Sequence, residues 1–247
     1  MSLPKIDAPT FEMKLISNNR DIRYRPFLVK EEKLLLMAME GGETQDVINA
    51  SKQIVNNCIL DEIDIDTLPL FDVQYALLKI RSKSIGEIAE VMVKHINDIN
   101  EKGEECKAST KVEVDVSSIV PVISENHSNM IRVTNDIGIQ MKYPTIKLYE
   151  KLGQMTENDN TNVEGFFDII LDCIDSIFQG NEVFNASDHS KEEMSDFLNS
   201  LTNEQFQKIQ EFFNTMPNLN HDINFVCKAC GCNETLTLNG LNDFFLS

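Results

Sequence analysis

The sequence has 247 residues, of which 42% are hydrophobic and 25% are charged, and its formal net charge is −18. This acidic balance argues against binding to a nucleic-acid backbone, which requires clustered lysine and arginine. No hydrophobic run approaches the ~18 residues of a membrane span, and the N-terminus lacks the apolar segment of a signal peptide. We therefore expect an intracellular protein whose six cysteines are thiols or metal ligands rather than disulfides.

Charge and aromatic residues are unevenly distributed along the chain. Residues 151–247 contain 16 acidic and 4 basic residues, together with 11 of the 14 phenylalanines. An acidic, phenylalanine-rich C-terminal part beside a more balanced N-terminal part indicates two sub-domains, or one core with distinct faces.

The N-terminal third begins with a predicted β-hairpin. Residues 11–15 and 22–25 alternate apolar and polar side chains, and turn-forming residues lie between them. Pro26 ends this hairpin because its ring removes a backbone donor. Strong helix formers then predict three helices, over residues 29–40, 44–58 and 70–80.

The middle of the chain predicts a small β region. Residues 88–93 fit either a helix or a strand, whereas residues 112–116 alternate clearly as a strand. A polar loop, residues 97–105, lies between them. Residues 130–133 and 137–141 flank a turn sequence and predict a second hairpin.

Helices are expected to return in the C-terminal half. Residues 165–178 form a strongly apolar stretch, which predicts a single buried helix. Capping boxes then begin at Ser190 and Thr202, where a hydroxyl and a side chain three residues later satisfy the first N–H groups reciprocally. These two helices extend to about Ser200 and Thr215.

These elements predict an α+β fold that is mainly helical, with an N-terminal β-hairpin and a small split zinc-ribbon-like β region. Four segments are expected along the chain. They are a hairpin with helices (1–84), a small β region with the first ribbon arm (85–144), a helical segment (145–216) and a C-terminal cysteine knuckle with a strand (217–247).

A cysteine motif near the C-terminus carries recognisable metal chemistry. Cys227 and Cys230 are separated by two residues, so their thiolates can bind one metal ion. Gly231 allows the turn to pass through positive φ. Residues 234–238 then alternate as a short strand, and a knuckle followed by a strand is typical of one arm of a zinc ribbon.

The other arm is predicted to begin at Cys106. Residues 106–109 read Cys-Lys-Ala-Ser and residues 227–230 read Cys-Lys-Ala-Cys, and each stretch precedes a Glu and an alternating strand. Ser109 is a poor zinc ligand, so two readings stay open: bound structural zinc, or a metal-free clasp held by packing and hydrogen bonds. The candidate ligands are Cys106, Cys227, Cys230 and Cys232, with His221 as an alternative fourth ligand. Cys58 and Cys173 lie on apolar helix faces and are expected to be small buried hydrophobic residues.

No catalytic constellation is recognisable. The sequence has four histidines without the His-Glu-x-x-His spacing, no glycine-rich phosphate loop and no Gly-x-Ser-x-Gly elbow. We therefore expect no enzymatic activity, with a zinc-dependent enzyme or regulator as the alternative. Basic residues gather between positions 20 and 33, either as a solvated hairpin face or as a docking surface for an acidic partner.

Several stretches, taken in order, resemble one family of proteins. They are Arg25–Ala38, Leu78–Ser84, Asn135–Pro144, Leu201–Phe213 and Gly240–Phe245. Together they are similar to the baseplate hub subunit or baseplate hub assembly protein of T4-like contractile-tailed phages. Members of that family tend to carry paired cysteines in both arms, so the chain departs from the pattern at one position.

The resemblance implies a non-enzymatic assembly factor that binds tail hub proteins in the host cytoplasm while the virion is built. A structural hub subunit retained in the virion baseplate is the alternative, and homo-oligomerisation stays open. On this reading we expect partner contacts from Arg23, Arg25 and Phe27.

Overall fold

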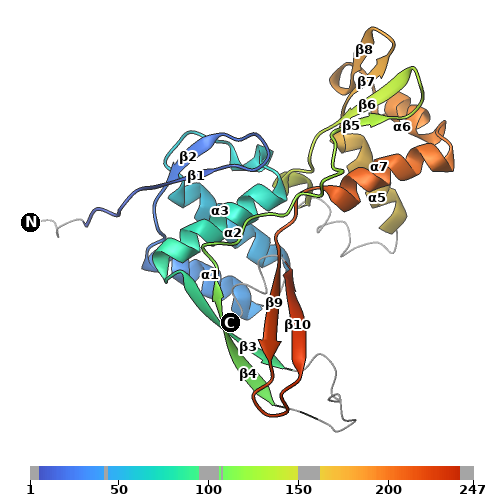
Figure 1. Ribbon diagram of the computed structural model, residues 1–247. Coiled ribbons are helices and arrows are strands. Elements are labelled where there is room, and N and C mark those ends of the chain that lie inside the picture. The colour runs from blue at the N-terminus through green and yellow to red at the C-terminus, as the bar shows by residue number, and fades with distance from the viewer. Residues whose placement is uncertain (1–5, 42–43, 95–105, 107, 150–161, 240–247) are drawn as a thin grey trace, which may run out of the picture. The chain divides into compact units, whose positions relative to one another are not determined.

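The computed structural model describes residues 6–41, 44–94, 106, 108–149 and 162–239 (Figure 1). The expected polar loop 97–105 and the closing stretch Gly240–Phe245 lie outside these residues. The chain divides into two compact units. Unit 1 comprises Met1–Ile63, Phe71–Val122 and Asn218–Ser247, and unit 2 comprises Asp64–Leu70 and Ile123–Pro217. Each unit gathers parts of more than one of the four segments expected from the sequence.

Unit 1 begins with the predicted hairpin and helices. Strands β1 (Phe11–Lys14) and β2 (Asp21–Tyr24) pair antiparallel, with Lys14 opposite Asp21. The three predicted helices are confirmed, and the structure extends the third. They are α1 (Val29–Gly41), α2 (Thr44–Cys58) and α3 (Leu70–Ser84). Most of α3 is buried, so this helix is central to the packing of unit 1.

Two further hairpins complete unit 1. Strand β3 (Ile88–Lys94) pairs with β4 (Ser109–Asp115), and β9 (Asn220–Val226) pairs with β10 (Asn233–Asn239). The two hairpins lie side by side in Figure 1 and share one hydrophobic cluster with Leu78 of α3. The apolar side chains of the four strands in this cluster are Ala89, Val91, Val93, Val114, Ile223, Phe225 and Leu238.

This shared cluster explains why residues 88–93 form a strand rather than a helix. Alternate side chains of β3 are buried between the hairpins, and the strand pairs with β4 along its whole length. The strand β9 was not predicted from the sequence. Its apolar Ile223 and Phe225 alternate with polar neighbours over too short a stretch to be distinctive, and pairing with β10 fixes the extended backbone.

Unit 2 is built on a four-stranded antiparallel sheet in the order β5-β6-β7-β8. The strands are β5 (Met130–Arg132), β6 (Ile137–Met141), β7 (Ile174–Gln179) and β8 (Glu182–Asn185). Helices α5 (Asn162–Cys173), α6 (Lys191–Asn199) and α7 (Asn203–Thr215) contribute to its core. Short 3₁₀ turns, η1 (Ile65–Thr67) and η2 (Ala186–Asp188), complete the unit. The predicted hairpin of β5 and β6 is confirmed.

The prediction of one helix over residues 165–178 is wrong at its C-terminal end. Helix α5 ends at Cys173, and the next residues enter the sheet as β7. The β-branched Ile174 and Ile177 are buried there, and β7 pairs with both β6 and β8. A continuous apolar run fits a buried helix and a central strand equally well. Pairing with the neighbouring strands therefore determines that these residues form a strand.

The prediction of a mainly helical fold is also wrong. The structure is 40% helix and 28% strand, and its described residues form ten strands in four sheets. The difference comes from strands that the sequence analysis missed or left undecided: β3, β7, β8 and β9. An α+β mixture still fits loosely.

Candidate functional site

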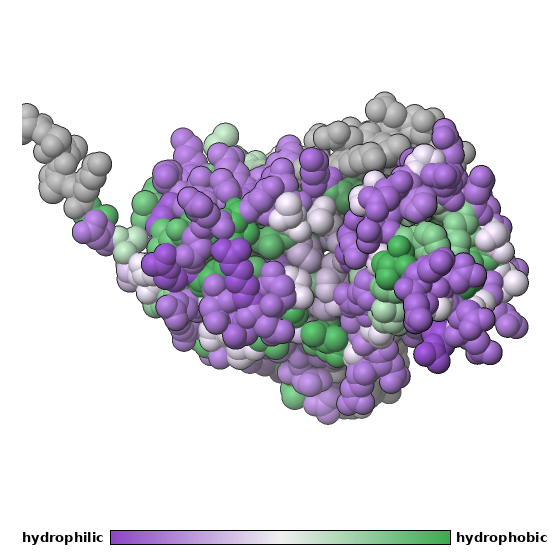
Figure 2. Space-filling view, turned by 90° about the horizontal axis from the view of Figure 1, so that it is seen from above, coloured by the Kyte–Doolittle hydropathy of each residue, from purple (hydrophilic) through white to green (hydrophobic). Residues whose placement is uncertain are grey.

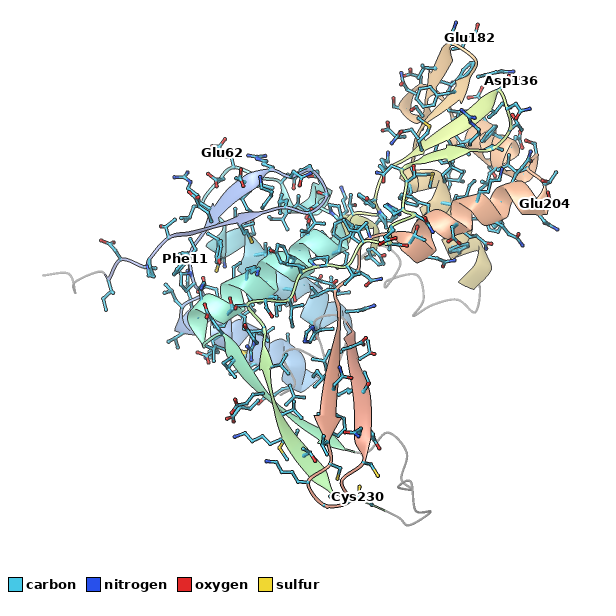
Figure 3. All side chains as sticks on the ribbon, viewed as in Figure 1. Phe11, Glu62, Asp136, Glu182, Glu204 and Cys230 are labelled. Atoms are coloured by element: carbon cyan, nitrogen blue, oxygen red, sulfur yellow. The ribbon has the colours of Figure 1, made fainter. Side chains whose placement is uncertain are left out.

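Three cysteine side chains meet at one end of the β3–β4 and β9–β10 hairpins of unit 1. Cys106 precedes β4, whereas Cys227 and Cys230 lie in the turn between β9 and β10, where Figure 3 labels Cys230. The Sγ atoms of Cys106 and Cys227 are 3.9 Å apart although the residues are 121 positions apart in sequence. All three sulfur atoms lie within 4.8 Å of one another, so this group, the cysteine trio, could hold a metal ion.

The turn that carries two of these cysteines is closed by backbone hydrogen bonds. The N–H of Cys227 donates to the carbonyl of Cys232 at 2.9 Å, and the N–H of Gly231 donates to the carbonyl of Cys227 at 2.8 Å. Gly231 has a φ of +78°, where a residue with a Cβ costs roughly 1–2 kcal/mol. The turn therefore fixes the backbone positions of Cys227 and Cys230.

The structure separates the two candidates for a fourth ligand. Cys232 is buried and lies outside the trio, but its thiol hydrogen-bonds to the thiol of Cys230. His221 pairs with Leu238 at the opposite end of the hairpin. It lies six residues before Cys227, a distance of about 20 Å along a strand, so it cannot reach the trio.

The first arm contacts the knuckle through a residue that the sequence analysis did not single out. Thr110 is buried, and its Oγ1 accepts a hydrogen bond of 3.4 Å from the backbone N–H of Lys228. Ser109 is exposed, because successive side chains of a strand point to opposite faces. The sequence did contain a signal for this contact: Thr110 has the same parity as Val112 and Val114 and therefore lies on the same face of the strand.

The neighbouring thiols change the pKa of Cys230. A backbone hydrogen bond at Cys232 lowers the pKa of Cys230, but desolvation and the thiols of Cys232, Cys227 and Cys106 outweigh it and raise that pKa to about 12. Without a metal ion, Cys230 is therefore protonated at neutral pH. Any metal that binds here has to displace protons.

The other two cysteines lie apart from the trio. Cys58 and Cys173 are 0% and 1% exposed, which confirms their prediction as small buried residues. Burial raises the pKa of Cys58 to about 11 and that of Cys173 to about 12. All six cysteines fall within the described residues, and none forms a disulfide there.

The three predicted partner-binding residues differ in exposure. Arg23 keeps 57% of its side chain exposed while its Nε and Nη2 donate to Oδ1 of Asp61 at 3.1 and 2.7 Å. That hydrogen bond to Arg23 lowers the pKa of the Asp61 carboxyl. The side chain of Arg25 is only 16% exposed, and Phe27 is buried. Of the three, only Arg23 presents most of its side chain at the surface.

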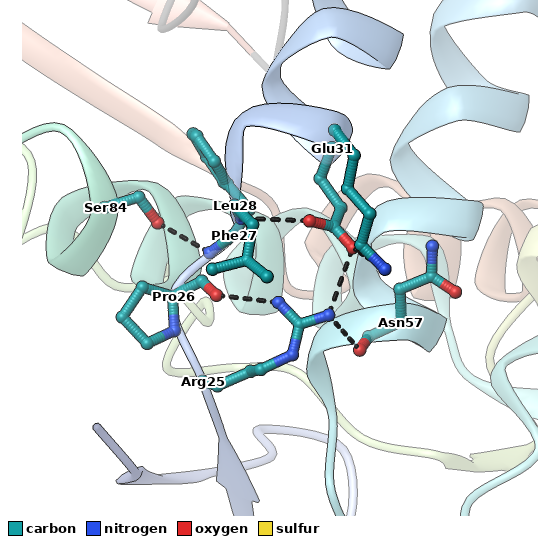
Figure 4. A network of polar contacts seen from close by, with 8 residues as sticks. Arg25, Pro26, Phe27, Leu28, Glu31, Asn57 and Ser84 are labelled. Carbon is teal, nitrogen blue, oxygen red and sulfur yellow. Dashed lines mark hydrogen bonds and ion pairs between the residues drawn. The ribbon is translucent and has the colours of Figure 1, made fainter. Parts of the chain in front are cut away.

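Arg25 belongs to a polar network at the start of α1 (Figure 4). Its Nη2 donates to Oε1 of Glu31 at 3.0 Å and to the carbonyl of Asn57 at 2.9 Å. Oε2 of Glu31 in turn accepts the N–H of Leu28 at 2.9 Å, which satisfies a donor at the helix N-terminus. One partly buried arginine thus joins the beginning of α1 to the end of α2.

Phe27 joins the same place to α3. Its backbone N–H donates to Oγ of Ser84 at 2.9 Å, at the end of that helix. The ring is buried while the next residues are not. Phe27 and Arg25 therefore hold the N-terminus of α1 in position.

One face of α1 exposes large apolar side chains. Val29, Leu36 and Met37 are 80%, 55% and 61% exposed, and their spacing of seven and eight residues places them on one side of the helix. Residues 34–37 are all apolar, and four consecutive residues of a helix point to different sides, so they cannot all face the core. This run in the sequence indicates an exposed apolar face.

An open depression of 660 Å³ lies beside the start of this helix. Its lining residues are Phe27, Leu28, Val29, Lys30, Glu32, Ser84 and Ile85. Leu28 and Ile85 are also exposed. On the face of the molecule drawn in Figure 2, by contrast, hydrophilic side chains predominate and hydrophobic areas are small and separate. We call the exposed residues Leu28, Val29, Leu36, Met37 and Ile85 the α1 surface.

A second metal site and a membrane-spanning helix are both absent from the part of the chain that the structure describes. Apart from the cysteine trio, no group of three histidine, cysteine or acidic side chains there has the spacing of a metal site. Within the same residues, no helix is both long and apolar enough to cross a membrane.

Comparisons with known proteins place the chain in a family. The family model described as T4 bacteriophage base plate protein matches residues 8–246. A comparison with curated proteins and one with solved structures gave no match. Because the family model spans nearly the whole sequence, the chain belongs to the T4 bacteriophage base plate protein family.

Proposed function

We propose that the protein is a non-enzymatic assembly factor that binds hub proteins of the phage baseplate in the host cytoplasm while the virion tail is built. Membership of the base plate family supports a role in that structure rather than catalysis. The observation that carries the proposal is the α1 surface. Exposed apolar side chains gathered on one helix face in this way favour a protein interaction site.

The predicted partner residues take separate roles in this proposal. Arg23 is exposed and is the one of the three that can contact a partner through its side chain. Arg25 and Phe27 position the N-terminus of α1 instead of contacting the partner. Apolar residues at the centre of an interface and charged residues at its rim are the usual arrangement.

The proposal is tested by co-purification of tagged protein from phage-infected cells. We expect Val29→Ser combined with Met37→Ser to reduce the recovery of hub proteins about tenfold, because buried apolar anchors supply most of the binding free energy of an interface. Val183→Ser is the matched control, since this valine is equally apolar and is 53% exposed on β8. Unchanged recovery with the double variant, at normal thermal stability, would rule out the α1 surface as the docking site.

A structural subunit of the baseplate hub, retained in the virion, is the second candidate. The family description favours it equally, because it names the base plate itself. Mass spectrometry of purified particles separates the two functions. If the protein is missing from mature particles and baseplates fail to assemble when its gene is deleted, the assembly factor is supported. A fixed stoichiometric copy number in the particles supports the structural subunit.

A further inference from the structure

The spacing of the cysteine trio matches a tetrahedral metal site. Four-coordinate Zn²⁺ with Zn–S bonds of about 2.3 Å holds its sulfur atoms about 3.8 Å apart. The Sγ atoms of Cys106 and Cys227 are 3.9 Å apart, and Cys230 Sγ lies within 4.8 Å of both. A disulfide would require about 2.05 Å, so these thiols are spaced for a shared ion rather than for a covalent bond.

We infer that Cys106, Cys227 and Cys230 bind one Zn²⁺ ion together with Cys232. This ion is a structural clasp, because it links the β3–β4 hairpin to the β9–β10 hairpin. Cys232 supplies the fourth sulfur because it lies in the same turn, where its carbonyl accepts the N–H of Cys227 at 2.9 Å, and because its thiol hydrogen-bonds to that of Cys230. Cys232 lies outside the group of sulfur atoms within 4.8 Å of one another, so its side chain has to move to become a ligand. A fully occupied tetrahedron of thiolates has no open position for substrate, which is the pattern of structural zinc.

Thiolates select zinc over the harder cations. Soft sulfur ligands in tetrahedral geometry favour Zn²⁺, whereas magnesium and calcium require oxygen ligands. Each cysteine releases its proton when it becomes a ligand, so four protons leave as one ion enters. Binding is therefore tighter at pH 8 than at pH 6.

The clasp would connect segments that are distant in sequence. Cys106 belongs to the first arm and the other three cysteines to the second, and unit 2 is inserted between the arms. The hydrophobic cluster around Ile223 and Val114 and the contact of Thr110 with Lys228 already join the hairpins without metal. We therefore expect loss of the ion to lower the stability of unit 1 without unfolding it.

Metal analysis of protein purified without added metal or chelator is the direct test. We expect one zinc per chain, and an X-ray absorption spectrum with four sulfur neighbours at about 2.3 Å. Cobalt substitution should give the visible absorption of a tetrahedral thiolate site. Chelation at pH 7 should lower the thermal midpoint while the far-ultraviolet circular dichroism is retained. A protein without bound metal that fails to take up zinc under reducing conditions would overturn the proposal.

Single substitutions test each ligand. Cys106→Ser, Cys227→Ser, Cys230→Ser and Cys232→Ser should each reduce bound zinc at least tenfold. Cys58→Ala and Cys173→Ala are the controls, because both thiols are buried elsewhere. Retention of zinc in Cys106→Ser would overturn the clasp, and an unchanged cobalt spectrum in Cys232→Ser would overturn the fourth ligand. A spectrum with an oxygen neighbour in the wild type would indicate an exchangeable water and an open site instead.

Discussion

Arg25 donates a hydrogen bond of 3.0 Å to Glu31, a carboxylate whose side chain is only 1% exposed. Desolvation alone would raise the pKa of this carboxyl, but hydrogen bonds from Leu28, Arg25 and Lys30 outweigh it and leave the pKa below its ordinary value. The pair connects the hairpin to the first helix. It shows that a basic residue in a charged stretch of sequence can be part of the interior.

We predict that Arg25→Ala destabilises unit 1 much more than Arg23→Ala. Removing Arg25 takes one charged hydrogen-bond donor from the buried Glu31 carboxylate, which keeps Lys30 and the N–H of Leu28, and this loss costs roughly 1.5–3 kcal/mol. Arg23 forms a solvent-exposed pair with Asp61, and water and salt screen such pairs so that they contribute little to stability. Urea denaturation followed by circular dichroism measures both. Equal costs for the two substitutions would contradict the assignment of Arg25 as a partly buried structural residue.

The same pair predicts a dependence on acid pH. A carboxyl whose pKa is lower in the folded state stabilises the fold above its unfolded pKa of about 4.3, and this contribution is lost as pH falls through the folded value. We expect the difference in stability between wild type and Glu31→Gln to be largest near pH 7 and to shrink below pH 4. Denaturation curves at several pH values give this difference directly, and a gap that stays constant down to pH 3 would show that Glu31 is not ionised in the fold.

Asp72 is predicted to tolerate asparagine better than alanine. It is 0% exposed and accepts the N–H of Ile16 at 2.8 Å and that of Ser17 at 3.4 Å, just after β1. Burial raises the pKa of Asp72 despite these bonds. Asparagine keeps an acceptor oxygen and removes the buried charge, whereas alanine leaves two N–H groups without a partner and costs about 2 kcal/mol.

The direction of the pH effect at Asp72 provides the control. Because the raised pKa disfavours the ionised form in the fold, this residue contributes less stability as pH rises above about 4 through its folded value. Asp72→Asn should lack that loss. Thermal unfolding at pH 4 and pH 7 compares the variants, and an asparagine variant as unstable as the alanine variant would contradict the argument.

Local signals in the sequence predicted much of this structure. Turn chemistry, helix propensity and capping act within a few residues, and they determine the elements that were predicted correctly. These are the hairpin that ends at Pro26, the first three helices and the helices that begin after Ser190 and Thr202. The meeting of Cys106 with Cys227 was also predicted. It followed from a repeated Cys-Lys-Ala sequence rather than from periodicity.

The remaining features depend on partners that are distant in sequence. Ile174 lies in an apolar run, and only pairing with β6 and β8 makes it part of a strand. Ile223 alternates weakly, and β10 supplies its partner strand. The partial burial of Arg25 depends on the carbonyl of Asn57 in α2, which lies 32 residues away in sequence. Such contacts are set by tertiary structure and override local preference.

The capping boxes of α6 and α7 give a prediction with a closely matched control. Ser190 Oγ accepts the N–H of Glu193 at 3.2 Å, and the N–H of Ser190 donates to Oε2 of Glu193 at 2.8 Å. We expect Ser190→Ala and Thr202→Ala each to destabilise unit 2 by about 1 kcal/mol. Ser195→Ala is the control, because this serine lies inside α6, where alanine is the better helix former.

The measurement is chemical denaturation of the three variants under one set of conditions. Ser195→Ala should be neutral or slightly stabilising, so the sign of the change separates the two positions. A loss at Ser195 as large as that at Ser190 would show that the hydroxyl itself, rather than its place at the helix start, determines the cost.

His127 predicts a loss of stability in unit 2 at mildly acid pH. Its Nδ1 lies 3.0 Å from Oγ1 of Thr215 and its Nε2 lies 2.9 Å from the hydroxyl of Tyr143, while its ring packs 5.2 Å from that of Phe212 between centroids. Burial lowers the pKa of His127 below its ordinary value near 6.5. The unfolded chain therefore binds a proton at a higher pH than the folded chain does, and stability falls as pH drops from about 6.5 toward the folded pKa.

Replacement of the imidazole tests this dependence. His127→Gln should cost about 1 kcal/mol at pH 7.5, because a partly buried hydrogen bond is lost, and its stability should change less than that of the wild type between pH 7.5 and 5.5. Tyr143→Phe is the companion variant, since it removes one hydrogen bond but keeps the titrating ring and hence the pH dependence. If wild type and His127→Gln lost stability in parallel over this range, the titrating group would lie elsewhere in the chain.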